Sequence, residues 1–280
     1  ASARSATRLT EPELQALDRD EVEAFVDGEP GLEAYEQYFD DVSRAKPHTR
    51  SAEVEELLAD LGEVAGAASD VYGMLSNADL TFPTVDRPDG GSVEITQGNF
   101  TKLQKHPDRR FRRTVYENYY DEWAEIRNAV GTSLKNSVRK DVKYARARNY
   151  DTAREAALDG PNVPVEVYDT LLDAVHDNLD VLHRHAELKR EALGVDELRM
   201  WDLYTSMAGD DAPEIPYERA AEYVTEAVAP PGAAYQQRVR GGPVSRWVAV
   251  HETPGTRLGV VGAGRYATPP FFLLHSQHDI

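Results

Sequence analysis

The most informative stretch of the chain spans Asn162–Tyr204 and reads NVPVEVYDTLLDAVHDNLDVLHRHAELKREALGVDELRMWDLY. Pro164 suits the first turn of a helix, where its missing N–H costs nothing. Apolar residues then recur at steps of three and four, namely Tyr168, Leu172, Val175, Leu179, Leu182 and Ala186. This spacing predicts one long amphipathic helix whose apolar stripe faces a core. A glycine, Gly194, ends it, and a short polar and aromatic segment follows.

Helix signals dominate most of the remaining sequence, and strand signals occur in two places. The β-rich runs 80–85 and 92–96 flank a Pro-Asp-Gly turn, which predicts a hairpin. The runs 246–251 and 257–262 flank a Thr-Pro-Gly turn and predict two further strands. The predicted fold is therefore mainly α, a multi-helix scaffold with a β-hairpin near 80–96 and a short β-sheet near 246–266. A boundary at the hairpin gives two domains, 1–96 and 97–280.

The chain is strongly acidic, with 49 Asp and Glu against 31 Lys and Arg and a net charge of −18. Nucleic acids and anionic membranes are poor partners for such a surface because both would be repelled. Only 7 of the cations are Lys and 24 are Arg. This bias favours a halophilic protein, since molar salt shortens the Debye length to about 3 Å and screens repulsion among carboxylates. An ordinary acidic protein is the alternative.

The chain has no cysteine, which excludes disulfides, cysteine ligands and a cysteine nucleophile. No apolar run approaches the roughly 18 residues of a membrane span, and no signal-peptide pattern opens the chain. A cytoplasmic location is therefore the default expectation. The chain begins at Ala1 and ends at Ile280, just after a run of Phe and Leu. We expect it to be a fragment, with an exposed apolar end at 271–274 that promotes association.

Ordered motifs cover most of the chain. The stretch quoted above carries the patterns Asn-Val-Pro-x-x-Val-Tyr, His-x-Asn-Leu and Asp-Leu-Tyr. The others are Arg44–Thr49 (Arg-x-x-Pro-His-Thr), Leu75–Thr84, Thr96–Phe100 (Thr-x-Gly-Asn-Phe), Asp108–Tyr116 (Asp-x-x-x-Arg-x-x-x-Tyr), Asn136–Tyr150, Ser245–Trp247 and Tyr266–Leu274. Each is weak alone, but in this order they resemble the oligoendopeptidase F family, zinc metallopeptidases of the thimet-oligopeptidase type.

The resemblance implies a peptidase scaffold and a mechanism. In the family, a His-Glu-x-x-His helix and a later Glu hold zinc, and a zinc-activated water hydrolyses short peptides. This chain lacks that motif. His183 and His185 are two residues apart, Thr253-Pro254-Gly255 follows His251-Glu252, and His275 and His278 stand alone near the end.

The chain stops about where the family's zinc helix begins. We therefore expect no catalytic residue and no metal ligand in it, no zinc bound by it, and no activity of the chain alone. The predicted 97–280 domain is the first part of the peptidase domain without its metal site. The isolated histidines (His48, His106 and His176) are interpreted as surface or packing groups.

The resemblance also implies a substrate-binding strand. The family's strand before the zinc helix borders the cleft and can pair with the backbone of a peptide. Here that strand contains Gly259, Val260 and Val261, which are the predicted substrate-binding residues. Val260 and Val261 replace a Gly-Ala-Tyr pattern, and Pro269 stands where a His is common.

Three alternatives stay open at the level of sequence. The strand at 258–262 could be an ordinary sheet edge. The chain could be a truncated or degenerate copy that acts as a helical peptide- or protein-binding module. It could also be an unrelated acidic helical protein, which a bundle without a hairpin at Asp86–Gly91 would favour.

Overall fold

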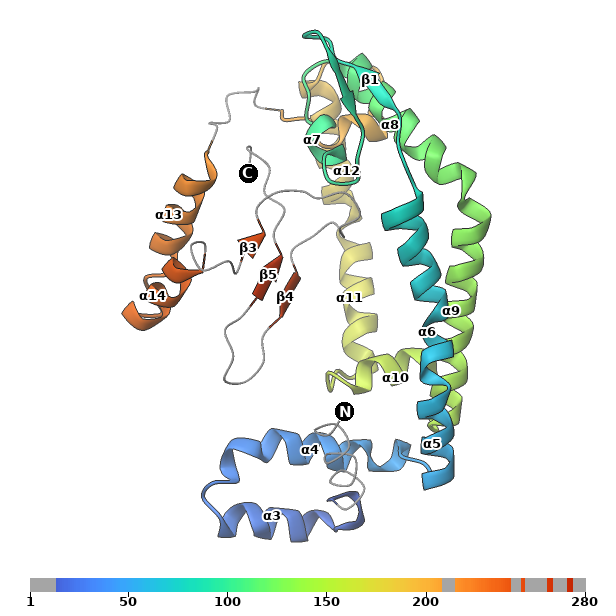
Figure 1. Cartoon of the computed structure of the whole chain (residues 1–280), viewed down its shortest axis with the longest axis vertical. Helices are drawn as coiled ribbons and strands as arrows, with labels where there is room; N and C mark the ends of the chain where they lie inside the picture. Colours follow the sequence, from blue (N-terminus) through green and yellow to red (C-terminus); the bar gives the residue numbers. More distant parts are fainter. Residues whose placement is uncertain (1–13, 208–214, 243–247, 250–260, 264–270, 274–280) are drawn as a thin grey trace. The chain divides into compact units, whose positions relative to one another are not determined.

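A computed structural model describes residues 14–207, 215–242, 248–249, 261–263 and 271–273 (Figure 1). These residues form two compact units, one from Ala1–Asp70 and Gly131–Leu179, the other from Val71–Val130 and Asp180–Ile280. The described helices before residue 127 are α3 (Arg19–Gly28), η1 (Glu33–Tyr35), α4 (Glu36–Ala45), η2 (Lys46–His48), α5 (Ala52–Asp60), α6 (Gly62–Met74), η3 (Leu75–Asp79), α7 (Phe100–Leu103) and α8 (Arg109–Glu125). Those after it are α9 (Arg127–Ala147), α10 (Ala153–Asp159), α11 (Val165–Asp177), α12 (Leu179–Ala192), η4 (Met200–Asp202), α13 (Tyr217–Ala227) and α14 (Ala233–Gly241). The predicted mainly α fold is confirmed.

In the first unit, the Arg-x-x-Pro-His-Thr motif packs on the end of α9. The ring of His48 stacks on Tyr150, with centroids 3.6 Å apart and planes 8° from parallel. His48 Nδ1 lies 3.0 Å from the carbonyl oxygen of Arg148, so this nitrogen donates. Arg148 in turn holds Glu55 of α5 with two hydrogen bonds of 3.0 and 2.9 Å. Two motifs about 100 residues apart in sequence thus form one junction.

The end of α9 needs a residue that tolerates a left-handed backbone. Asn149 has φ of 62°, and the N–H of Tyr150 donates to the carbonyl of Ala145 at 2.9 Å. This six-residue closure is the usual left-handed helix stop, for which Asn is the best choice after Gly. The stop turns Tyr150 toward His48, which explains why Arg-Asn-Tyr ends the motif.

Arg44 completes the junction from α4. Its guanidinium lies 2.7 Å from Asp41 and 3.1 Å from Asp159 of α10. The Tyr150 hydroxyl donates to the other oxygen of Asp159 at 2.7 Å. Asp159 is therefore shared by an arginine and a tyrosine that belong to two different motifs.

We expect the Tyr150 phenol to ionise at a higher pH than an ordinary tyrosine. Burial, followed by the hydrogen bond to Asp159, raises the pKa of Tyr150 to about 12. Because the folded pKa exceeds the unfolded value near 10, its stabilising contribution is complete below pH 10 and is lost as the pH rises through 12. A spectrophotometric titration of the wild type minus that of Tyr150→Phe should isolate this phenol. A difference curve centred near pH 10 would contradict the burial and the bond.

The core of the second unit lies under the predicted hairpin, which is confirmed. Strands β1 (Thr84–Asp86) and β2 (Ser92–Glu94) are antiparallel, with Val85 opposite Val93. The turn uses Gly90 and Gly91 at positive φ, where a side chain would strain the backbone. The buried residues that form one cluster beneath it are Val85, Ile95, Phe100, Leu103, Phe111 and Val115. A hairpin at this position argues against the unrelated-bundle alternative.

The aromatic residues of α8 pack mainly on this core. Phe100 stacks on Tyr119 at 4.0 Å, and Phe82 stacks on the same tyrosine at 4.6 Å. Tyr116 also packs against the cluster, whereas Tyr120 is 45% exposed. Tyr116 and Tyr119 therefore belong to the packing of this core.

The predicted long helix of the opening stretch is wrong in one respect, because it is two helices. Asn178 leaves the helical region with φ of −112° and ψ of 12°, which separates α11 from α12. The predicted buried stripe is also wrong, since Tyr168, Leu172, Val175 and Leu182 are exposed. Periodicity identifies the residues that share a helix face but not the element that covers that face.

The C-terminal sheet contains a third strand besides those in the predicted runs 246–251 and 257–262. Strand β5 (Phe271–Leu273) lies between β3 (Val248–Ala249) and β4 (Val261–Ala263). It pairs in parallel with β3 and antiparallel with β4. The run that we expected to be an exposed apolar end thus supplies the central strand, and a continuous apolar run is typical of central strands.

Candidate functional site

The strongest polar centre in the described residues surrounds Asp202 of η4, in the second unit. Its side chain is fully buried. Arg109 and Arg112 reach it from α8, with Arg109 Nη2 2.8 Å from Oδ2 and Arg112 Nη2 3.0 Å from Oδ1. The backbone N–H of Arg199 donates to Oδ2 at 2.9 Å. Asp202 therefore ties the start of α8 to the segment after α12.

Arg112 also holds three backbone carbonyls. Its Nη1 donates to His106 and Pro107 at 2.7 and 2.9 Å, and its Nε donates to Trp201 at 2.9 Å. The planar guanidinium suits this use because its five N–H donors are fixed in a fork. Arg112 is only 3% exposed, so its charge relies on Asp202. Lys189 of α12, also buried, donates to the carbonyl of Leu203.

The start of α8 is fixed by Asp108, the first residue of its motif. Asp108 Oδ1 accepts the N–H of Phe111 at 2.9 Å, which is a helix N-cap. That hydrogen bond is the main reason why the pKa of Asp108 is lowered. Tyr116, the last residue of the same motif, meets Trp201 edge-on at 5.8 Å. The motif 108–116 and the Trp-Asp-Leu-Tyr tail thus meet in one place.

The pKa of Asp202 is lowered, which restricts its chemistry. Burial acts to raise the pKa, but hydrogen bonds from Arg109, the Arg199 backbone and Arg112 outweigh it. Burial, then repulsion by Arg112, lowers the pKa of Lys189. A carboxylate with both oxygens engaged by arginines is a poor general base and has no lone pair aimed at a substrate. This centre therefore holds the start of α8 against the segment after α12, and we assign it no catalytic step.

Sequence reasoning included Asp202 in the Asp-Leu-Tyr pattern but gave it no role. A signal was present, because Arg109 and Arg112 are three residues apart and share one face of a helix. An Asp between Trp201 and Leu203, in an apolar setting, needs such a partner if it is buried. No sequence pattern, however, pairs residues that lie 90 positions apart.

The histidines do not form a metal centre in the described part of the chain. His176 on α11 and His183 and His185 on α12 are exposed, and no group of three His, Cys, Asp or Glu able to hold a metal occurs among the described residues. His48 stacks on Tyr150, and His106 lies edge-on to Phe111 at 4.7 Å, which confirms their packing role. His251, His275 and His278 lie outside the described residues. The described donors therefore do not fit zinc.

One of the three predicted substrate-binding residues lies in a described strand. Val261 begins β4 and is opposite Leu273 of β5, while Gly259 and Val260 lie outside the described residues. Of the described strands, only β5 pairs with β4, so β4 is an edge of this sheet. An edge strand presents unpaired N–H and C=O groups that can accept another extended chain.

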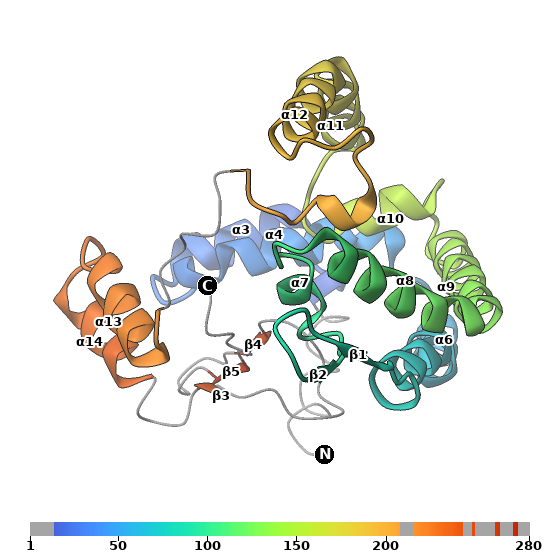
Figure 2. The same ribbon diagram turned by 90° about the horizontal axis from the view of Figure 1, so that it is seen from above.

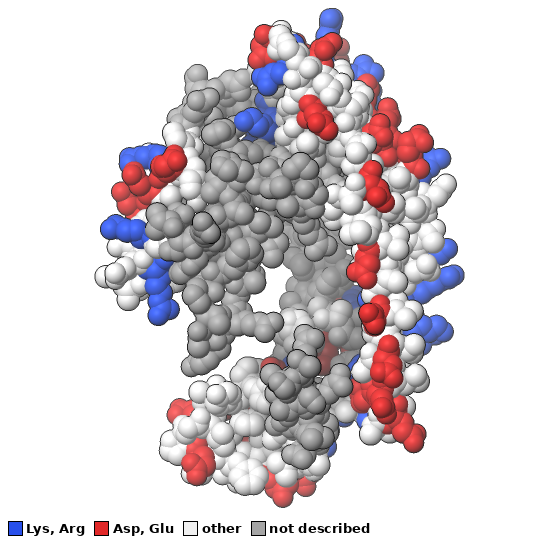
Figure 3. Space-filling model, viewed as in Figure 1, with Lys and Arg blue, Asp and Glu red and all other residues white. Residues whose placement is uncertain are grey.

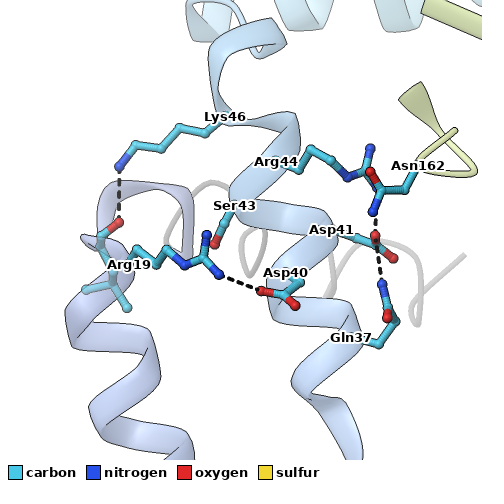
Figure 4. A pocket seen from close by; sticks show the side chains of 9 residues that line it. Arg19, Gln37, Asp40, Asp41, Ser43, Arg44, Lys46 and Asn162 are labelled. Carbon is cyan, nitrogen blue, oxygen red and sulfur yellow. Dashed lines mark hydrogen bonds and ion pairs between the residues drawn. The ribbon is translucent and has the colours of Figure 1, made fainter. Parts of the chain in front are cut away.

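The first unit contains a cavity of about 540 Å³ between α3 and α4 (Figure 4). Its cations are engaged within it, since Arg19 pairs with Asp40 at 3.5 Å and Arg44 with Asp41 at 2.7 Å. Lys46 donates to the carbonyl of Leu17 at 3.1 Å. The two arginines are paired with carboxylates and Lys46 is hydrogen-bonded to the backbone, so we assign no function to this cavity.

The motifs and fold match one class of proteins. The family model described as Oligopeptidase F matches residues 13–82, and the one described as Peptidase family M3 matches residues 102–233. The chain belongs to the oligoendopeptidase F family, within peptidase family M3.

Similar curated proteins include oligopeptidase PepF of Bacillus subtilis, 34% identical over 99% of this chain and 42% of PepF. Group B oligopeptidase PepB of Streptococcus agalactiae is 36% identical over 96% of this chain and 45% of PepB. The crystal structure of oligoendopeptidase-F from Enterococcus faecium is 36% identical, with a TM-score of 0.66 over 84% of this chain and 44% of that one. The chain thus spans less than half the length of the relatives that it matches.

Proposed function

We propose that this chain is the scaffold part of a zinc metalloendopeptidase that hydrolyses short peptides. The observation that carries the proposal is the match of both family models, in order, to a chain whose motifs meet in two packed junctions. PepF and PepB are named oligopeptidases, which supports short peptides as the substrate class. Zinc would supply the activated water, and residues outside the printed sequence would hold it.

Within that proposal, this chain contributes structure and part of a substrate surface. The 1–96 domain and the 97–280 part of the peptidase domain stay proposals, as does a cytoplasmic, halophilic setting. In the described part of the chain, no helix is long and apolar enough to cross a membrane. Gly259, Val260 and Val261 are proposed to bind the peptide backbone, in line with the edge position of β4.

Amide hydrogen exchange tests this substrate surface. Adding a short peptide should slow the exchange of the amides of residues 259–263, because an added strand supplies partners for an open edge. The amides of α8 serve as the internal control and should not change. Unchanged exchange at 259–263 under saturating peptide would remove these residues from the proposed site.

The second candidate is a degenerate copy that only binds peptides or proteins. The departures from the family pattern at Val260, Val261 and Pro269 favour it. Reading the coding DNA downstream of Ile280 separates the two. An in-frame His-Glu-x-x-His supports the metalloendopeptidase, and the protein expressed from that frame should hydrolyse peptides until a chelator is added. A stop codon or frameshift directly after Ile280 supports the degenerate copy.

A further inference from the structure

The basic residues of α9 stand out in a chain of net charge −18. The helix carries six cations and a single acid, Asp141, which lies 3.0 Å from Lys140. Three of the seven lysines of the whole chain lie on it. Four of its cations recur at steps of four, four and three and form what we term the basic row: Lys135, Arg139, Lys143 and Arg146.

The basic row is exposed and lacks partners. All four side chains are exposed, and none forms an ion pair or side-chain hydrogen bond with any described residue. Like charges four residues apart on a helix repel and cost about 0.2–0.5 kcal/mol per pair in isolated helices. The row therefore does nothing for the stability of α9.

A complementary row lies on the neighbouring helices of the same unit. Helices α5 and α6 carry six carboxylates and no Lys or Arg. Glu55 is taken by Arg148, and five exposed acids without an ion pair to any described residue remain. We term them the acidic row: Glu53, Glu56, Asp60, Glu63 and Asp70.

The two rows face away from each other. Figures 1 and 2 both place α6 beside α9, and Ser133 of α9, which is buried, donates to the carbonyl of Ala68. The Tyr144 hydroxyl likewise donates to the carbonyl of Leu58. Since these residues are turned between the helices, the rows lie on the outer sides of the pair. Figure 3 shows the acids gathered over α5 and α6 and the cations along the edge formed by α9. They cannot neutralise each other within one molecule.

The first four residues of the acidic row match the basic row in length, and both rows are flanked by exposed apolar side chains. At about 1.5 Å per helical residue, Lys135–Arg146 spans about 16 Å and Glu53–Glu63 about 15 Å, with Asp70 about 10 Å further along. Val64, 72% exposed, and Leu57 lie beside the acidic row. Leu134, 66% exposed, and Val138 lie beside the basic row. Each side is thus a charged stripe next to an apolar one, which is a common composition of helix-packing surfaces.

We propose that α9 of one copy of this chain binds α5 and α6 of a second copy through the basic and acidic rows. Because the two surfaces differ, the contact is head-to-tail and leaves a free row of each sign. We commit to a second copy because it presents a row of the opposite charge at matching spacing, beside exposed apolar side chains.

Sedimentation velocity on the whole chain at low salt tests the contact. The wild type should associate as its concentration rises and dissociate in molar salt, where the Debye length is about 3 Å. The variant Lys135→Glu/Arg139→Glu/Lys143→Glu should weaken association by about tenfold or more, since rim charges become repulsive. The control Arg110→Glu/Arg184→Glu/Arg238→Glu changes the net charge equally and should leave association unchanged.

A mixture of two charge-reversed variants provides the decisive test. The variant Glu56→Lys/Asp60→Lys/Glu63→Lys should also fail to self-associate, but an equimolar mixture of the two reversed variants should associate like the wild type. A wild type that stays monomeric at every concentration overturns the proposal, whether or not it binds anionic vesicles or DNA. Equal loss in the control, or no recovery in the mixture, overturns it too.

Discussion

Replacing Asp202 with alanine is expected to lower the free energy of unfolding of the second unit by about 3–5 kcal/mol. The carboxylate is fully buried and neutralises Arg112, which is itself 3% exposed. Its removal leaves a buried guanidinium without its ion-pair partner among the described residues. Urea denaturation followed by far-UV circular dichroism measures the change.

Two variants sharpen this test. Asp121→Ala, an exposed acid on α8 without a described ion pair, should change the free energy of unfolding by less than about 0.5 kcal/mol. Asp202→Asn keeps the shape and loses the charge, so it should fall between alanine and wild type. An Asp202→Ala protein as stable as Asp121→Ala would show that the two arginines do not depend on Asp202.

The same centre has a defined pH dependence. The folded pKa of Asp202 lies below its unfolded value because the hydrogen bonds from Arg109, Arg199 and Arg112 outweigh burial. Its stabilising contribution is therefore complete above an unfolded pKa of about 3.9 and is lost as the pH falls through the lower folded value. The stability gap between wild type and Asp202→Ala should hold from neutral pH down to about pH 4 and shrink below it.

Replacing Phe100 with alanine is the second large effect, with an expected loss of about 3–5 kcal/mol. The ring is 8% exposed and stacks on Tyr119 at 4.0 Å, next to Ile95 and Val115 in the core under the hairpin. Truncation leaves a cavity that the surrounding strands and α8 cannot fill completely by relaxation. The midpoint of urea unfolding should move down accordingly.

The matched control is Phe25→Ala on α3. Phe25 is 57% exposed, so the same truncation removes little buried area and should cost less than about 1 kcal/mol. Equal destabilisation by the two variants would contradict the placement of the core beneath β1 and β2.

The sequence predicted local structure correctly where a single short segment determines the conformation. The turn Pro88-Asp89-Gly90-Gly91 predicted the hairpin, and in the structure both glycines have positive φ. The packing roles of His48 and His106 also followed from their isolation. The family followed from the order of motifs along the chain.

What sequence reasoning missed depends on partners far away in the chain. The division at Asn178 leaves no clear mark, because apolar steps continue across it. The central position of β5 depends on pairing with two strands, and neither pairing is visible in the run Phe271–Leu273 itself. The Asp202 centre joins residues 90 positions apart, so its chemistry appears only when the fold is known.

The central claim is that this chain supplies scaffold to a peptidase and lacks the catalytic metal site. Hydrolysis of a short internally quenched peptide by the purified chain, with zinc added and with a chelator in parallel, tests it most directly. We expect no turnover above a mock preparation in either condition, from a chain whose cooperative urea unfolding shows that it is folded. Peptide hydrolysis that co-purifies with the chain, requires zinc and stops on chelation would contradict the claim.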